Sequence, residues 1–290
     1  MKGAPSQLRT AGLTSLAMLA FAANSLLCRA ALIDTQIDAA SFTSIRLISG
    51  ALMLWLIVTI RGSSVNQPVF FAGSWRSALA LFVYAAAFSF AYLSLTAATG
   101  ALLLFVAVQI TMIGYGLCQG ERLLPLQWIG VFCAFAGLVG LLLPGLSTPP
   151  IGAALLMLAA GIAWGAYSLR GKGQGDATQV TTGNFLRAVP FTVVLSLFFL
   201  PQLQFDRIGM FYAIASGGLA SGAGYALWYA VLPMLRASSA ATVQLSVPVI
   251  AAFAAVLLLS EPITLRLVLT SLAILGGVAL VIHAKSIQQH

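Results

Sequence analysis

Charged side chains are scarce in this sequence. Only 7% of its 290 residues are Asp, Glu, Lys or Arg, whereas 60% are apolar, and the mean hydropathy is +1.01. Soluble domains carry roughly 25% charged residues, so the composition excludes a soluble globular protein. The net charge of +8 is not gathered in a basic patch with interleaved aromatic residues, and we therefore expect no nucleic-acid partner.

Carboxylates are the rarest charged groups, and none lies in the middle of an apolar run. The six are Asp34, Asp38, Glu121, Asp176, Asp206 and Glu261, all at loops or at the ends of runs. Proton-coupled exchange needs a group that is protonated on one side of the membrane and deprotonated on the other. Because an ionisable residue deep in the membrane is the usual place for such a group, its absence predicts transport without proton coupling.

Glu121 and Glu261 have two interpretations. They are either gating or coupling acids, or interface residues that stabilise the start of the following helix through its dipole. In the second interpretation, which we favour, they pair with Arg122 or Arg266.

Residues for catalysis and metal binding are also few. Cys28, Cys118 and Cys133 lie in apolar runs without zinc or thioredoxin spacing, which is typical of packing residues. His283 and His290 lie at the C-terminal end. The sequence contains no nucleophile elbow, P-loop or cluster of metal ligands. We expect no enzyme activity, no cofactor and no metal.

Long apolar runs fill the chain instead. Each has roughly the 17–25 residues that a helix needs to cross a bilayer, and the loops between them are short and rich in Gly, Pro and Ser. The predicted helices cover residues 11–32, 40–60, 77–95, 100–117, 126–143, 151–169, 184–200, 208–232, 240–259 and 267–282. The fold class is therefore an all-α membrane protein with ten transmembrane helices.

One pattern occurs twice. Glu121 lies between two membrane-length apolar runs and precedes Gly137 by 16 residues, and Glu261 has the same spacing to Gly277. Internal repeats of this kind indicate duplication. We predict two five-helix repeats, residues 11–143 and 151–283.

The basic residues predict the orientation. If the N-terminus is inside, ten of the 14 Lys and Arg residues lie on the inner side and four on the outer side, in agreement with the positive-inside rule. An even number of helices places both termini in the cytoplasm. Five helices per repeat is an odd number, so the second copy is inverted, as in many secondary transporters with a midplane substrate site.

These features resemble the drug/metabolite transporter superfamily, and in particular its EamA-type ten-helix branch with the YddG-like exporters. The resemblance is carried by residues 97–100, 120–122 and Gly137 in the first copy, and by residues 237–241, Pro248, Glu261 and Gly277 in the second. It implies export of amino acids or other metabolites across a bacterial inner membrane, with the fifth and tenth helices packed outside the path. Where Pro248 kinks the second copy, the first has Gln109.

Candidate substrate-binding residues are aromatic side chains at helical spacing and amides within apolar runs. Tyr84, Phe88 and Tyr92 recur every four residues and so share one helix face. We consider two interpretations of these three residues: they form a wall of the substrate cavity, or they pack between helices without contacting substrate. The other candidates are Asn24, Gln109, Trp164, Tyr167, Tyr225, Trp228, Tyr229 and Gln244.

The candidate gating residues are Gly100, at the start of the fourth predicted helix, and Pro248, which kinks the ninth. Three arginines, Arg29, Arg46 and Arg187, lie within a few turns of helix ends. Snorkelling of their guanidinium groups to the lipid headgroups is the favoured interpretation, and binding of a substrate carboxylate is the alternative.

Taken together, these patterns predict a carrier of small, partly apolar metabolites, most of all amino acids, that works by alternating access. The first, third, fourth, sixth, eighth and ninth helices line its path. The partners are a small-molecule substrate and membrane lipids, and a monomer suffices because one chain holds both repeats. A proton-coupled antiporter is the alternative within the same class, and a channel or membrane-embedded enzyme is the alternative of another class.

Overall fold

The computed structural model of the protein describes residues 7–61, 72–120, 123–143, 148–171, 176–235 and 243–288, and within these ranges all regular structure is helical. Each of the ten predicted segments is represented by helix. The main elements are α1 (Gln7–Asp34), α2 (Ala39–Arg61), α3 (Trp75–Tyr92), α4 (Ala97–Cys118), α5 (Pro125–Leu142), α6 (Ile151–Arg170), α7 (Ala177–Phe198), α8 (Arg207–Ile214), η3 (Ala215–Ala223), α9 (Gly224–Val231), α11 (Ser246–Leu259) and α12 (Leu265–Gln288).

Most helix ends agree with the predicted ones within a few residues, but α7 begins seven residues earlier than predicted. The reason is Asp176, whose carboxylate accepts hydrogen bonds from the backbone N–H groups of Thr178 and Gln179. This is an ordinary N-cap, and the polar first turns of α7 concealed it from a search for apolar runs. The predicted start of the ninth helix, at Ala240, lies outside the described residues.

The helices present apolar side chains to the outside. Within the described ranges, α1, α2, α4, α5, α6 and α7 are each long and apolar enough to cross a membrane. Large apolar residues such as Phe132, Phe198 and Leu272 are mostly exposed. Because water would penalise so much exposed apolar surface, these faces are suited to lipid.

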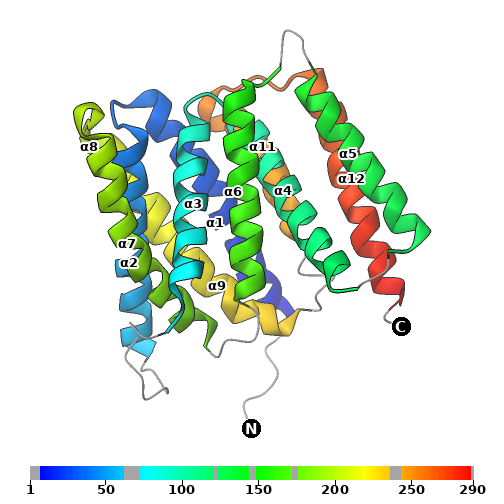
Figure 1. The fold of residues 1–290 in the computed structure, drawn as a ribbon, viewed down its shortest axis with the longest axis horizontal. Helices are drawn as coiled ribbons and strands as arrows, with labels where there is room; N and C mark the ends of the chain where they lie inside the picture. The colour runs from blue at the N-terminus through cyan, green and yellow to red at the C-terminus, as the bar shows by residue number, and fades with distance from the viewer. Residues whose placement is uncertain are drawn as a thin grey trace.

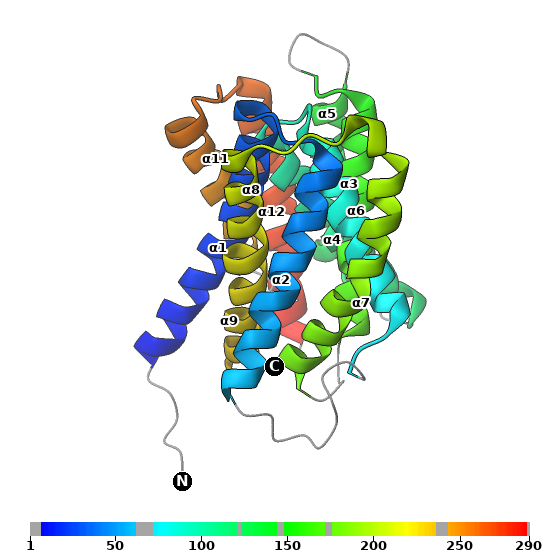
Figure 2. The same ribbon diagram turned by 90° about the vertical axis from the view of Figure 1, so that its left-hand side faces the viewer.

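Two groups of helices are visible in Figure 1. The antiparallel pair α5 and α12 stands at one side, and the remaining helices form a bundle in which α3 packs on α6, and α2 packs on α7 and η3. The start of α1 and the end of α12 lie at the same end of the molecule in Figures 1 and 2. The peripheral place of α5 and α12 agrees with what the resemblance implied for the fifth and tenth helices.

Glycines explain how α5 and α12 approach each other so closely. A Cβ atom at Gly277 would lie 2.4 Å from the carbonyl oxygen of Gly130, and one at Gly137 would lie 2.8 Å from the side chain of Ile274. The two glycines at matched spacing in the sequence, Gly137 on α5 and Gly277 on α12, therefore both lie in the contact between these two helices. Their role in this structure is close packing of helix backbones.

The predicted eighth helix contains an unexpected irregularity. Residues Ala215–Ala223, between α8 and α9, form a π-helix that packs against α1 and α2. At the contact with α2, a Cβ atom at Gly217 would lie 2.0 Å from the carbonyl oxygen of Arg46. Long π-helical stretches are rare, and π-helical turns are frequent at functional sites.

Candidate functional site

A small cavity lies at the centre of the bundle. Its volume is about 30 Å³, enough for one or two water molecules. All six helices that the sequence analysis assigned to the path contribute to it. Its walls are formed by Phe21, Asn24, Ser25, Tyr84, Phe88, Leu104, Phe105, Trp164, Ala220, Ser221, Tyr225 and Gln244.

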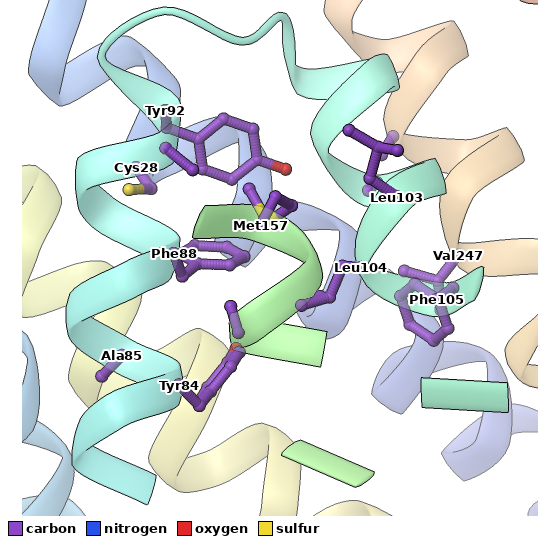
Figure 3. Packing of buried hydrophobic residues seen from close by; sticks show 14 of the residues in the cluster. Cys28, Tyr84, Ala85, Phe88, Tyr92, Leu103, Leu104, Phe105, Met157 and Val247 are labelled. Atoms are coloured by element: carbon purple, nitrogen blue, oxygen red, sulfur yellow. The ribbon is translucent and has the colours of Figure 1, made fainter. Parts of the chain in front are cut away.

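Aromatic rings form most of the cavity wall. The indole of Trp164, on α6, lies 4.9 Å from the ring of Tyr84 and 5.1 Å from that of Tyr225, measured between centroids. Figure 3 shows Tyr84, Phe88 and Tyr92 one above another along one face of α3, as their spacing predicts. Rings from α3, α6 and α9 therefore enclose one space, which suits an apolar group of a ligand.

A chain of polar side chains crosses the bundle beside these rings. The hydroxyl of Ser216, in the π-helix, donates to the side-chain oxygen Oδ1 of Asn24 at 2.7 Å. The amide of Asn24 donates to the hydroxyl oxygen of Tyr84 at 3.2 Å, and Nη2 of Arg46 donates to the same oxygen at 2.9 Å. The π-helix, α1, α3 and α2 are thus joined through one tyrosine hydroxyl.

Arg46 is almost completely buried, with 2% of its surface exposed. Its guanidinium carbon lies 5.1 Å from the ring centroid of Tyr84 and 4.7 Å from that of Phe88, distances at which a cation is attracted to an aromatic face. Its Nη1 is buried and has no hydrogen-bond partner. Snorkelling to the headgroups is therefore wrong for Arg46, because the side chain turns inward to the rings.

The end of the bundle away from both described termini is closed by an ion pair. Nε of Arg29 donates to Oε1 of Glu261 at 3.0 Å, and the backbone N–H of Ala97 donates to Oε2 at 2.8 Å. Nη1 of Arg29 also donates to the carbonyl oxygen of Tyr92. This contact is called the outer closure because it lies at the end of the bundle away from the described termini; it consists of Arg29, Glu261, Tyr92 and Ala97. It connects α1, α3, the start of α4 and the loop before α12.

The predicted partner of Glu261 is wrong, whereas that of Glu121 stays a prediction. Glu261 pairs with Arg29, which is 232 residues away in the sequence, and it caps α4. Arg266 donates to the carbonyl oxygen of Leu143 and to the hydroxyl of Thr148. Glu121 and Arg122 lie outside the described residues.

The opposite end of the bundle is joined by hydrogen bonds to neutral groups. Nη1 of Arg187 donates to the backbone carbonyls of Ala72 and Gly183. Nε of Arg170 donates to the hydroxyl of Ser77 at 3.3 Å. These contacts connect α6 and α7 with the start of α3 and the residues before it.

Comparison with known proteins agrees with this architecture. The profile of the EamA-like transporter family matches residues 151–283. An uncharacterised protein of Pseudomonas aeruginosa is 58% identical over 277 residues, which are 96% of this chain and 96% of that protein. The chain belongs to the EamA-like transporter family. It is thus a member of the drug/metabolite transporter superfamily and a multi-pass membrane transporter of small molecules, not an enzyme.

Two more distant similarities extend the comparison. The uncharacterised transporter YoaV of Bacillus subtilis is 24% identical over 188 residues, 62% of this chain and 64% of that one. A protein of known crystal structure has 18% identity and a TM-score of 0.68, with 98% of this chain and 100% of the other covered. That structure shares the fold of this EamA-family chain.

Several predicted site residues lie outside the cavity of this EamA-family protein. Tyr92 is above it, at the outer closure, and Tyr167 is below it, 3.4 Å from the hydroxyl of Thr181. Trp228 contacts Phe21 at an edge, 6.1 Å between centroids. Gln109 is buried in α4 away from the cavity walls, and Tyr229 packs at the margin of the core. Their roles in binding stay predictions.

The two candidate gating residues occupy tight places. A Cβ atom at Gly100 would lie 2.3 Å from Cε1 of Tyr92, so this glycine lets the ring rest against the first turn of α4. Pro248 is buried near the start of α11. Their part in gating stays a prediction.

Sequence reasoning missed half of the cavity lining. The missed residues are Phe21, Ser25, Leu104, Phe105, Ala220 and Ser221. Four of them, Leu104, Phe105, Ala220 and Ser221, are ordinary small or apolar residues of membrane helices, and no sequence signal identifies them. Phe21 precedes Asn24 by three residues and Ser25 by four, so the helical period places it on the same face as each of them. The polar pair Asn24-Ser25 could therefore have identified Phe21 and Ser25.

Among the described residues, no three His, Cys, Asp or Glu side chains come close enough to hold a metal ion. The cavity therefore offers aromatic faces, hydroxyls, amides and one buried cation behind the rings. These groups can bind a small, partly apolar molecule, and they provide no nucleophile paired with a base.

Proposed function

We propose that this protein is a carrier that exports small metabolites, most of all amino acids, by alternating access. The observation that carries the proposal is the central cavity, which receives residues from both halves of the chain. Tyr84 and Asn24 come from the first half, and Trp164 and Tyr225 from the second. A site between two halves can be exposed to each side in turn when the halves move against each other.

The helix packing supports an inverted repeat of residues 11–143 and 151–283. α3 packs on α6, and the eighth segment (α8, η3 and α9) packs on α1. A two-fold axis in the membrane plane would exchange these two contacts. The same axis would relate α5 to α12, α2 to α7 and α4 to α11, and each of these pairs is in contact.

The outer closure supports a gated path. Arg29 belongs to the first half and Glu261 to the second, and both are mostly buried. If the N-terminus is cytoplasmic, this ion pair seals the external side above the cavity. Opening to that side would separate Arg29 from Glu261, with Gly100 and Pro248 as the points where α4 and α11 yield.

Transport without proton coupling fits the composition of the cavity. None of its lining residues is Asp, Glu or His, and Glu261, above it, is engaged by Arg29 and by the N-terminus of α4. The substrate gradient alone would then drive the flux.

Exchange in proteoliposomes tests the carrier. Vesicles loaded with unlabelled phenylalanine or leucine should take up the labelled amino acid faster and to a higher transient level than unloaded vesicles. A carrier with one alternating site requires this counterflow, whereas a channel gives equal uptake in both. Equal uptake, or none above protein-free vesicles, would refute the proposal.

Orientation in a bacterial inner membrane, with cytoplasmic termini and a monomer as the working unit, belongs to the same proposal. On a cysteine-free background, Gln202→Cys should be labelled only from outside and Gly173→Cys only from the cytoplasm. Light scattering of the detergent-purified protein should give a monomer that retains counterflow after reconstitution. The reverse labelling pattern would contradict the inverted repeat.

A further inference from the structure

Arg46 is a buried cation that forms no ion pair with any carboxylate among the described residues. Among pairs of described residues, Arg29 and Glu261 form an ion pair, and Arg46 takes part in none. Arg46 is instead held by one hydrogen bond to the hydroxyl of Tyr84 and by the faces of Tyr84 and Phe88. Burying a charge is costly unless the charge is paired and hydrogen-bonded. An arginine at membrane depth is therefore expected to have a function.

The groups near Arg46 leave hydrogen-bond donors unused. Tyr84 Oη accepts from both Arg46 and Asn24, so its own O–H remains free to donate. Nη1 of Arg46 and the hydroxyl of Ser221 are buried without partners. Tyr84 and Ser221 both line the cavity. A cavity with unused donors and a cation behind its wall is suited to a ligand that brings an anionic acceptor.

We propose that the transported substrate carries a carboxylate, which accepts the Tyr84 O–H while Arg46 supplies the compensating charge from behind the ring. This inference rests on the proposed function and names the substrate class of the same cavity. A monoanion is favoured over a phosphate ester, because Arg46 is one positive charge and the cavity walls contain no second cation. Tyr84 is the contacting residue and Arg46 positions and polarises it.

The aromatic walls then take the apolar part of the substrate. The cavity has a volume of only about 30 Å³, so the rings of Trp164 and Tyr225 must move apart to admit a side chain. The hydroxyl of Ser221, which has no hydrogen-bond partner among the described residues, lies on the π-helix four residues before Tyr225. Because Ser221 also lines the cavity, its hydroxyl is the candidate donor to the second carboxylate oxygen.

Matched pairs of probes test the proposal. Phenylalanine and phenylalaninamide, and leucine and leucinamide, differ in the carboxylate and share the rest. Each is to be measured twice, as a competitor of labelled amino-acid counterflow in proteoliposomes and as a ligand that raises the melting temperature of the purified protein. We expect each amide to act at least tenfold more weakly than its acid, a difference of about 1.4 kcal/mol.

Four variants separate recognition from structure. Arg46→Gln should reduce the preference for acid over amide to within about twofold, because the guanidinium charge that favours the carboxylate of the acid is removed. Arg46→Lys should restore part of the preference, and Tyr84→Phe should lower it while the charge and ring remain. Arg187→Gln is the matched control: it removes another buried arginine, one bonded to backbone carbonyls outside the cavity, and should leave the preference unchanged.

The outcomes distinguish the two proposals. An acid preference that is undiminished in folded Arg46→Gln, or undiminished in Tyr84→Phe if Arg46→Gln does not fold, overturns the carboxylate site. Stronger binding of phenyl phosphate than of phenylalanine overturns the assignment to a monoanion. Counterflow that is equally fast with amides refutes this inference and leaves the carrier intact. Acid-selective stabilisation without counterflow of any probe refutes the carrier and leaves the site intact.

Discussion

Arg29 and Arg46 are both largely removed from solvent, yet they have opposite surroundings. Arg29 meets a carboxylate, a backbone carbonyl and the first turn of α4 through Glu261. Arg46 meets two aromatic faces and one hydroxyl, and one of its nitrogens has no partner. The guanidinium charge of Arg29 is paired with a carboxylate of the protein, whereas that of Arg46 is not, among the described residues.

The difference separates closure from recognition. A paired, mostly buried charge becomes expensive when it is separated from its partner, which suits a contact that holds one conformation. Burial of an unpaired charge costs free energy in the protein without ligand. A ligand of opposite charge lowers this cost when it binds. The two arginines therefore predict different responses to the same kind of substitution.

The largest effect is expected from Arg46→Met. Replacing a buried ion pair by apolar side chains of similar volume is often neutral or stabilising, and we expect the same for Arg46, which has no charge partner that the substitution would leave behind. The melting temperature should therefore stay the same or rise, while counterflow of carboxylate substrates falls by about 100-fold, or about 2.8 kcal/mol. A melting temperature that falls while counterflow persists would make Arg46 a structural residue and remove the contrast with Arg29.

A smaller effect, of opposite kind, is expected from Glu261→Gln. It leaves Arg29 mostly buried without a charge partner, which should lower the free energy of unfolding by about 2 kcal/mol with little change in KM. This is less than for a fully buried pair, because 14% of the Arg29 side chain and 11% of the Glu261 side chain are exposed. Chemical denaturation in detergent and transport kinetics measure the two effects. The swapped double variant, Arg29→Glu with Glu261→Arg, should recover part of the lost stability, and a swap that recovers nothing would argue against the pair.

Glycine substitutions compare the peripheral helix pair with the central bundle. At Gly277 a Cβ atom would lie 2.4 Å from the carbonyl oxygen of Gly130, so Gly277→Ala should force α5 and α12 apart at a cost of about 1–3 kcal/mol. Gly276→Ala is the matched control, because nothing lies within 4 Å of a Cβ atom there. We expect a lower melting temperature for Gly277→Ala alone. KM should be unchanged in both, and a changed KM would connect α5 and α12 to the substrate path.

The smallest expected effect is that of a pH gradient. With no titratable carboxylate or imidazole among the cavity-lining residues, an imposed gradient should not accumulate a net-neutral amino acid in proteoliposomes. Accumulation against the substrate gradient would contradict uncoupled transport. Glu261→Gln would then show whether the outer closure contributes the coupling group.

Local features of this protein could be predicted from the sequence because they depend on short-range order. Hydropathy over a bilayer-length window locates the helices, and the four-residue spacing of Tyr84, Phe88 and Tyr92 places their side chains on one face. The structure has all three rings on one side of α3, with Tyr84 and Phe88 in the cavity wall. Helical period decides the face, but only the neighbouring helices decide which residues of that face meet the cavity.

Other features depend on contacts between distant segments and could not be predicted in this way. The Arg29–Glu261 pair spans 232 residues. The π-helix of η3 has the composition of an ordinary glycine-rich helix, and its register brings Ser216 to Asn24 only when α1 is in place. For Arg46, the sequence position near a helix end suggested the headgroups, whereas the rings of α3 attract the guanidinium inward.

The central claim is that the carboxylate of the substrate accepts a hydrogen bond from Tyr84 and that its negative charge is compensated by the buried guanidinium of Arg46. The most direct test is an experimental structure of the protein with the amino acid that gives the fastest counterflow. We predict a carboxylate oxygen about 2.5–2.7 Å from Oη of Tyr84, with the apolar side chain of the substrate among Trp164, Tyr225 and Phe88. A ligand bound with its carboxylate away from Tyr84, or bound outside the central cavity, would contradict the account.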